Sequence, residues 1–187
     1  MLTTQLGGKF STEDSGLFTL KKVLLNAGIN VAYPTGNSIV TVQNGVPLTF
    51  DPKTEHRSFY EIEIDYLKSI KDSDIHIIHN KHIDNLGYIG ESASVELAYA
   101  LVHNKPVCLM YPPTFSDKVR DSIKQIINKN ADLFLTTNLI VINNDELHNT
   151  LSDYASKAIK YRLNVLEEIE IYNIIKKTLN SYIIRDV

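Results

Sequence analysis

Short apolar runs alternate with longer amphipathic runs along most of this chain, and that alternation constrains its fold more than any other feature. Short apolar runs bounded by turn residues are typical of buried strands, and apolar residues spaced at the helical period predict helices. A repeated strand–helix order predicts an α/β sandwich around a mostly parallel sheet. We therefore expect about five mostly parallel strands with helices packed on them.

The predicted strands and helices follow from this pattern. Strands of the sheet are expected at Leu2–Leu6, Ile29–Tyr33, Asp74–His79, Val107–Tyr111 and Leu139–Asn143. Gln43-Asn44-Gly45 predicts a hairpin insert, with strands at Ser38–Val42 and Val46–Phe50. Helices are expected at Leu17–Ala27, Glu55–Lys71, the segment after Gly90, Phe115–Ile127, Asp145–Arg162 and Asn164–Ser181.

Ligands of such folds bind beyond the carboxyl ends of the strands. Three predicted loops meet this edge: Gly7–Phe10, Asn80–Gly90 and Tyr111–Thr114. The length of 187 residues suits one domain, residues 1–142, with a C-terminal helical extension, residues 143–187. We expect the extension to pack on the same domain or on a partner subunit.

Composition excludes several classes of protein. The net charge is −3 and the chain has no strong basic stripe, which argues against broad nucleic-acid binding. No apolar run approaches the roughly 18–20 residues of a membrane span. Cys108 is the single cysteine, so an internal disulfide is excluded and a cytoplasmic location is the default expectation.

The segment Gly87–Leu101 predicts a glycine- and serine-rich turn that opens a helix. From Ala93 to Val102 the only charged side chain is Glu96, and all other residues there are Ala, Ser, Val, Leu or Tyr. Such a helix is expected to be buried on most of its surface, where a carboxylate needs a partner or a function. Glu96 also lies about one turn inside the helix N-terminus, a position that favours negative charge and bound anions.

This segment resembles the nucleoside 2-deoxyribosyltransferase superfamily, most closely the branch whose helix begins with a Gly-Tyr-Ile-Gly-x-Ser turn. The resemblance rests on Gly87-Tyr88-Ile89-Gly90-Glu91-Ser92, Glu96-Leu97-Ala98-Tyr99-Ala100 and Lys105-Pro106-Val107. Tyr66–Ile75 resembles the family's helix before its third strand, and Gly7-Gly8-Lys9-Phe10 is a looser match to its first loop. The similar region covers residues 1–142.

The resemblance implies a flavodoxin-like three-layer sandwich that forms a dimer or tetramer. It also implies cleavage of the N-glycosidic bond of a deoxynucleoside or deoxynucleotide, a small-molecule substrate, with Glu96 as the nucleophile toward C1′. The family's second acidic residue matches Asp65 with an offset of about one residue, and Glu61 and Glu63 compete for that role. Helix-start serines of the family match Ser92 and Ser94.

The expected substrate-binding residues lie in the first loop and at the helix start: Gly7, Gly8, Phe10, Gly87, Tyr88, Gly90, Ser92 and Ser94. Each has a plainer interpretation. The glycines suit ordinary turns, and the two serines suit helix capping.

Two further sequence patterns bear on whether the protein holds a metal ion or a cofactor. His76, His79 and His82 follow a metal-like spacing, but residues three apart on a strand face opposite sides, which argues against a metal site. The chain has no Walker loop and no strand-anchored G-x-G-x-x-G, so no cofactor is implied.

Four functions stay open. The first is a glycosidic enzyme, either a transferase or a hydrolase of 5′-monophosphates; a phosphate would contact Lys9 or the helix start at Ser92–Ser94. The second is a non-catalytic sensor of a nucleotide ligand. The third is a phosphoribohydrolase, although that group's Pro-Gly-Gly-x-Gly-Thr-x-x-Glu pattern is absent. The fourth is a structural role in which the terminal helices serve assembly.

Overall fold

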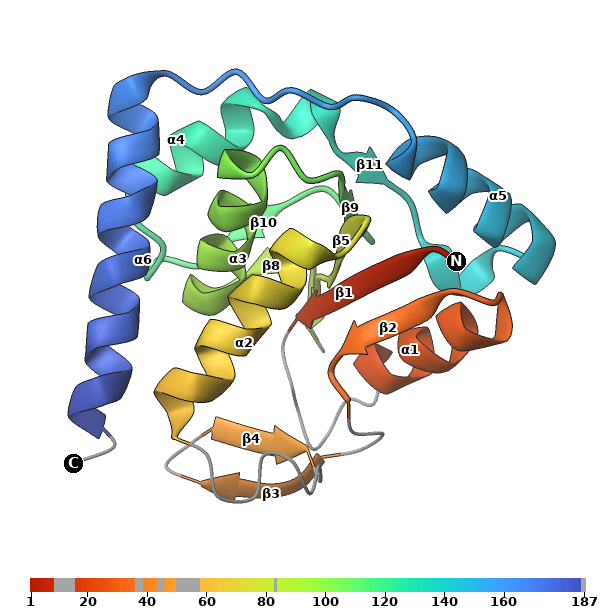
Figure 1. Ribbon diagram of the computed structural model, residues 1–187, viewed down its shortest axis with the longest axis horizontal. Helices are drawn as coiled ribbons and strands as arrows, with labels where there is room; N and C mark the ends of the chain where they lie inside the picture. The colour runs from red at the N-terminus through yellow and green to blue at the C-terminus, as the bar shows by residue number, and fades with distance from the viewer. Residues whose placement is uncertain (9–15, 36–38, 44–45, 50–57, 83, 186–187) are drawn as a thin grey trace.

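A central sheet of five parallel strands organises the protein (Figure 1). The computed structural model describes residues 1–8, 16–35, 39–43, 46–49, 58–82 and 84–185. The strands are β1 (Thr3–Gly8), β2 (Asn30–Tyr33), β5 (Ile75–His79), β9 (Val107–Leu109) and β11 (Leu135–Thr136), in the order β11-β9-β5-β1-β2. This order is that of a flavodoxin-like fold, with the chain reversing direction across the sheet between β1 and β5.

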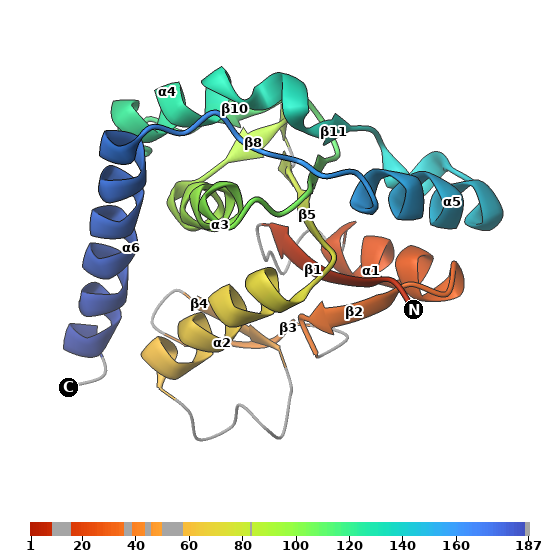
Figure 2. The ribbon, with the colours of Figure 1, turned by 45° about the horizontal axis from the view of Figure 1, so that its top comes forward.

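Helices cover both faces of the sheet (Figures 1 and 2). On one face, α1 (Gly16–Asn26) packs beside α5 (Asn144–Ala155). On the other face lie α2 (Phe59–Asp72) and α3 (Glu91–Val102). Two more helices pack around α3, namely α4 (Asp121–Lys129) and the long α6 (Val165–Arg185), which also contacts α2. The expected α/β sandwich with a parallel sheet is therefore confirmed.

The side chains of β5 point alternately to the two faces of the sheet, and each face has its own hydrophobic core. Ile75 and Ile77 join the cluster under α1 and α5, whereas Ile78 joins the cluster under α2, α3 and α6. Successive side chains of a strand point to opposite faces, so His76 shares the α2–α3 face with Ile78. A polar residue is thus buried on the same face as the helix that carries Glu96.

Short strand pairs surround the carboxyl edge of the sheet. The predicted hairpin is confirmed by antiparallel β3 (Ile39–Gln43) and β4 (Val46–Thr49). A second antiparallel pair joins β6 (Lys81–His82) to β7 (Asn85–Leu86). A parallel pair joins β8 (Tyr88–Ile89) to β10 (Thr114–Phe115), which brings the loops after β5 and β9 together.

The predicted strand at Leu139–Asn143 is wrong. Leu139–Val141 forms a 3₁₀ turn, η2, that begins where the Asn138 side chain accepts a hydrogen bond from the Ile140 backbone N–H. The fifth strand is the shorter β11, whose Leu135 and Thr136 pair with Cys108 and Leu109. Leu139 is buried under α1 and satisfies the apolar pattern without joining the sheet.

Two predicted helices also have different bounds. Phe115 belongs to β10, and α4 begins at Asp121. The first terminal helix ends at Ala155 rather than Arg162, because the following chain finds acceptors elsewhere. The Arg162 N–H donates to Asn130 Oδ1 at 2.7 Å, and the Tyr161 N–H donates to Asn104 Oδ1 at 3.1 Å.

The predicted extension, residues 143–187, packs on the sheet domain at two places. In α5, Leu147, Leu151 and Tyr154 enter the core that contains α1. In α6, Ile171, Ile174 and Ile175 enter the core that contains α3. Among the described residues, none of the helices combines the length and apolarity needed to cross a membrane.

Candidate functional site

The carboxyl ends of β1 and β5 lie at the point where strand order reverses, which is the usual ligand position in open α/β sheets. Gly7 and Gly8 end β1 there, and α3 carries Glu96 onto the same place. A Cβ atom at Gly7 would overlap the Glu96 carboxylate and lie 3.1 Å from His76 Cε1. Gly7 therefore leaves the space that the Glu96 carboxylate occupies.

Glu96 and His76 face each other in the interior. Glu96 is 7% exposed and His76 is fully buried, with 3.7 Å between Glu96 Oε2 and His76 Nε2. That separation exceeds a hydrogen bond. Among the described residues, Glu96 Oε2 has no hydrogen-bond partner, whereas the Gln5 backbone accepts a hydrogen bond from the His76 ring. Burial lowers the pKa of His76 to about 3, so its imidazole is neutral at neutral pH.

Helix α2 adds Glu63 and Tyr66, three residues apart and so on one helix face. The Tyr66 hydroxyl donates a hydrogen bond of 2.6 Å to the Leu6 backbone oxygen on β1. Burial raises the pKa of Glu63 to about 7. Burial, and then the nearby charge of Glu63, raise the pKa of Glu96 well above its usual value.

We call Glu63, Tyr66, His76 and Glu96 the Glu96 cluster. Its members come from α2, β5 and α3, and Gly7 of β1 lies beneath it. It combines a carboxyl group whose pKa is raised by burial, a neutral imidazole and a second carboxyl group whose pKa is about 7. Titratable groups whose environments separate their pKa values are the usual equipment for acid–base chemistry.

The predicted second acid, Asp65, does not point in the same direction as Glu63, the residue of α2 that acts on Glu96. The two residues are two positions apart on α2, so they point in different directions. Asp65 has a side chain that is 34% exposed and forms an ion pair of 3.8 Å with Lys68. Of these two acids, Glu63 is the one whose charge acts on Glu96.

The predicted first-loop residues divide into two groups. Gly7 lies against Glu96, and Gly8 has a φ of +143° with its would-be Cβ 2.6 Å from the His79 backbone oxygen. Glycine is therefore required at position 8 by backbone conformation and by close approach to backbone, whereas a side chain at Gly7 would displace the Glu96 carboxylate. Phe10 and Lys9 lie outside the described residues.

The glycines at the start of α3 have structural duties. Gly87 has a φ of +90°, donates to Asn80 O and accepts from the Thr114 N–H, each at 2.7 Å. The expected meeting of the loops Asn80–Gly90 and Tyr111–Thr114 is thus confirmed. The ring of Tyr88 packs over Gly90, at 3.2 Å from its would-be Cβ.

The two serines do not cap α3. Gly90 is the N-cap and supplies no side-chain hydrogen bond, so the capping interpretation is wrong. Ser92 is exposed, and Ser94 is buried with its hydroxyl donating to the Glu91 backbone oxygen at 2.6 Å. Ser94 faces a different space from the Glu96 carboxylate.

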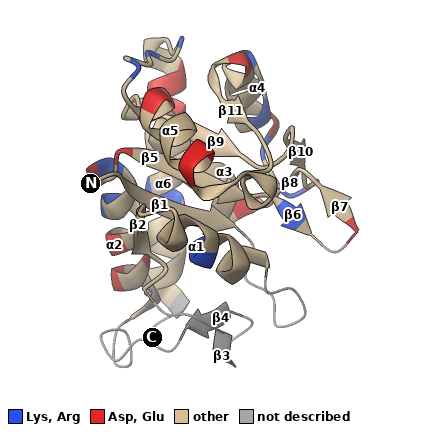
Figure 3. Cartoon of the chain, turned by 90° about the vertical axis from the view of Figure 1, so that its right-hand side faces the viewer, with Lys and Arg blue, Asp and Glu red and all other residues tan. Residues whose placement is uncertain are grey.

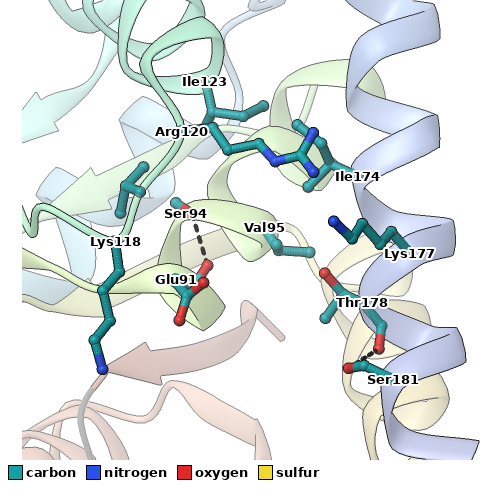
Figure 4. Close-up of a pocket in the computed structure, with 11 residues that line it drawn as sticks. Glu91, Ser94, Val95, Lys118, Arg120, Ile123, Ile174, Lys177, Thr178 and Ser181 are labelled. Carbon is teal, nitrogen blue, oxygen red and sulfur yellow. Dashed lines mark hydrogen bonds between the residues drawn. The ribbon is translucent and has the colours of Figure 1, made fainter.

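That space is a cavity of about 250 Å³ between α3, α4 and α6 (Figure 4). Ser94 and Val95 line it from α3, Arg120 extends toward it from the N-cap of α4, and Lys177 extends toward it from α6. Arg120 lies 3.9 Å from Glu170, and the cavity is partly basic. Glu96 is not among its lining residues, so the cavity and the Glu96 cluster lie on different sides of α3.

Away from this cavity, acidic and basic residues do not separate into patches of one sign in the view of Figure 3. They are interspersed over several helices and the β6–β7 hairpin. Within the described parts of the chain, no three His, Cys, Asp or Glu side chains gather closely enough to hold a metal ion.

Three members of the Glu96 cluster were missed as site residues in the sequence analysis, or ranked below another residue. The sequence indicates His76 only as a possible metal ligand and places Tyr66 in a predicted helix. Glu63 was a competitor to Asp65. A polar residue within the apolar run Ile75–Ile78 was the one available signal, because a buried strand seldom holds an unpaired histidine.

Comparisons with known proteins identify no family. No family model matches the chain, and no curated protein matches it either. Among solved structures, a conserved protein from Enterococcus faecalis V583 is similar, at 16% sequence identity and a TM-score of 0.40. The similarity covers 95% of this chain and 99% of that protein. A likeness of this degree indicates neither family nor function.

Proposed function

We propose that this protein cleaves or transfers the N-glycosidic bond of a deoxynucleoside or deoxynucleotide, with Glu96 as the nucleophile. The observation that carries the proposal is the position of Glu96, a helix-borne carboxyl group packed over Gly7 at the carboxyl ends of β1 and β5. Ligands bind at this edge in such folds, and a rigid helix is a suitable mount for a nucleophile.

The reaction we propose proceeds with retention, in two displacements. A carboxylate oxygen of Glu96 bonds to C1′ as the C1′–N bond breaks, and the base leaves with the electron pair and accepts a proton. Water or a second base then attacks C1′, loses a proton to the group that protonated the leaving base, and releases Glu96 as a carboxylate. Glu63 is our candidate donor of that proton, since a pKa of about 7 suits general acid catalysis at neutral pH. Asp65 stays a prediction.

The test is release of free base from a panel of nucleosides and nucleotides, followed by chromatography. The panel contains deoxyribose and ribose forms, with and without a 5′-phosphate. Glu96→Gln is expected to lower the rate by about 10⁴-fold or to background, because the nucleophile is lost. Glu91→Gln, on the exposed first turn of the same helix, is the matched control and keeps wild-type activity.

Further components of the assay separate the open alternatives. A free acceptor base that receives the sugar identifies a transferase, and release that needs only water identifies a hydrolase. Preference for ribose would favour a phosphoribohydrolase. Wild-type turnover by Glu96→Gln would rule out the proposed nucleophile.

A second candidate is a non-catalytic protein that binds a nucleotide ligand. The burial of Glu96 favours it, because its carboxyl group is 7% exposed and burial raises its pKa, which disfavours the charged form that a nucleophile needs. A thermal shift with nucleotides, without base release at high protein concentration, would support this alternative.

Assembly and location stay predictions. We propose that the protein forms a homo-oligomer in the cytoplasm and acts without a cofactor, as the resemblance and composition imply. Sedimentation at micromolar concentration measures the oligomeric state.

A further inference from the structure

The buried contact between His76 and Glu96 calls for a chemical explanation. Glu96 Oε2 and His76 Nε2 lie 3.7 Å apart, and within the described part of the chain Glu96 Oε2 has no hydrogen-bond partner. The Gln5 backbone accepts a hydrogen bond from the His76 ring, which leaves the other ring nitrogen as a proton acceptor. Unpaired polar atoms in a protein interior cost free energy, so they are rare without a function. A carboxyl group and an imidazole that face each other can satisfy both atoms with one shared proton.

One proton makes this pair neutral as a whole. It can reside on Glu96, beside a neutral imidazole, or on His76, beside a carboxylate. The first arrangement avoids charge in a buried site and fits the raised pKa of Glu96 and the lowered pKa of His76. The second arrangement supplies the carboxylate that nucleophilic attack requires.

We propose that His76 is the internal proton acceptor of Glu96. As positive charge develops at C1′ of the substrate, the Oε2–H bond of Glu96 breaks and an N–H bond forms at Nε2 of His76. The pair stays neutral overall, and no proton passes to solvent. The inference rests on the proposed function for the event that drives the transfer. His76 acts through Glu96 and is a positioning residue that does not touch the substrate.

The surroundings of the pair suit this transfer. From α2, Glu63 and Tyr66 face the pair, and each interacts electrostatically with Glu96. On the sheet, β1 presents Gln5, which is in register with His76, and β9 presents Val107. Hydrogen bonds between catalytic groups are often long in an empty site and shorten when substrate binds.

The pH dependence of kcat for base release tests the role of His76. In His76→Asn, Glu96 ionises only by losing its proton to solvent. We expect kcat at pH 7 to fall about 10²–10⁴-fold, with a smaller change in KM. The ratio of variant to wild-type kcat is then expected to rise with pH, because burial raises the pKa of Glu96 and the variant depends on loss of that proton to solvent. Taking the ratio cancels the titration of Glu63, which both proteins share.

His79→Asn is the matched control, since His79 is buried on the same strand but on the other face. The ratio of the kcat of His79→Asn to that of wild type is expected to be independent of pH. His76→Gln, with a side chain closer in length to histidine, repeats the test and guards against a folding defect specific to asparagine. A pH-independent ratio for folded His76→Asn or His76→Gln would overturn the proposal, since a merely structural role lowers activity equally at every pH.

Infrared difference spectra of wild type against Glu96→Gln give a readout without substrate. A protonated carboxyl band from Glu96 at pH 7 is expected, and its absence would overturn the inference. If the band is present but wild type releases no base from any substrate, the proposed function fails while the shared proton is upheld. The two failures are therefore distinguishable.

Discussion

At the scale of single residues, Gly7 determines whether Glu96 can reach the sheet. The carboxylate lies where any side chain at position 7 would begin, and His76 closes the other side of that space. The glycine is therefore required by a neighbour that is distant in sequence, rather than by its own backbone conformation.

Replacing Gly7 with Ala tests this requirement. The new methyl group displaces the Glu96 side chain, and such overpacking costs roughly 1–3 kcal/mol of unfolding free energy. The rate of base release is also expected to fall, because the displaced Glu96 is the proposed nucleophile. Urea unfolding and the chromatographic assay measure the two effects.

Gly28→Ala is the control for Gly7→Ala. Gly28 has a φ of +74° with no atom within 4 Å of its would-be Cβ, so alanine there costs only backbone strain of about 1 kcal/mol. Its activity should equal that of wild type. Full activity in folded Gly7→Ala would contradict the packing of Glu96 over residue 7.

At the scale of elements, the short strand β11 depends on a helix that follows it in the chain. The Tyr154 hydroxyl of α5 lies 2.9 Å from Val107 O and 2.7 Å from Leu133 O, and it accepts a hydrogen bond of 3.1 Å from the Leu135 N–H. One side chain thus joins α5 to both β9 and the start of β11. A strand of two residues acquires its place through this contact.

Removing the Tyr154 hydroxyl should loosen this edge of the sheet. Tyr154→Phe leaves the Leu135 N–H without its acceptor and is expected to cost roughly 1–3 kcal/mol of unfolding free energy, measured by urea denaturation. Tyr172→Phe, at a tyrosine that is 50% exposed on α6, should change stability by less than about 0.5 kcal/mol. Equal effects of the two substitutions would exclude the proposed role of Tyr154.

At the scale of the whole molecule, the buried acids of the Glu96 cluster make stability depend on pH. The pKa of Glu63 rises from 4.5 to about 7 on folding, so the folded protein holds this proton more tightly than the unfolded chain. The contribution of Glu63 is fully present below pH 4.5 and is lost as pH rises through about 7. Stability is expected to fall over that interval.

Glu63→Gln should flatten this dependence. A shift from 4.5 to about 7 corresponds to roughly 2–3 kcal/mol once partial solvent access is considered, and the variant removes that loss between pH 4.5 and about 7. Urea unfolding at several pH values measures it. Glu168→Gln, at an exposed position of α6, serves as the reference. Parallel curves for wild type and Glu63→Gln would contradict a buried Glu63.

The sequence by itself determined the α/β class, the parallel sheet, the β3–β4 hairpin and the burial of Glu96 on α3. These features follow from local periodicity and turn chemistry, which nearby residues decide. The helix start after Gly90 was likewise predictable, although the expected capping by Ser92 and Ser94 is wrong, because Gly90 itself occupies the N-cap.

Only the tertiary structure decided which residues meet. His76 reaches Glu96 because strand pairing sets its face, Glu63 reaches it because α2 packs beside α3, and β11 forms because Tyr154 lies across it. Each of these contacts joins segments far apart in the chain. Local propensity does not encode them, since they arise from the packing of whole elements onto a shared sheet.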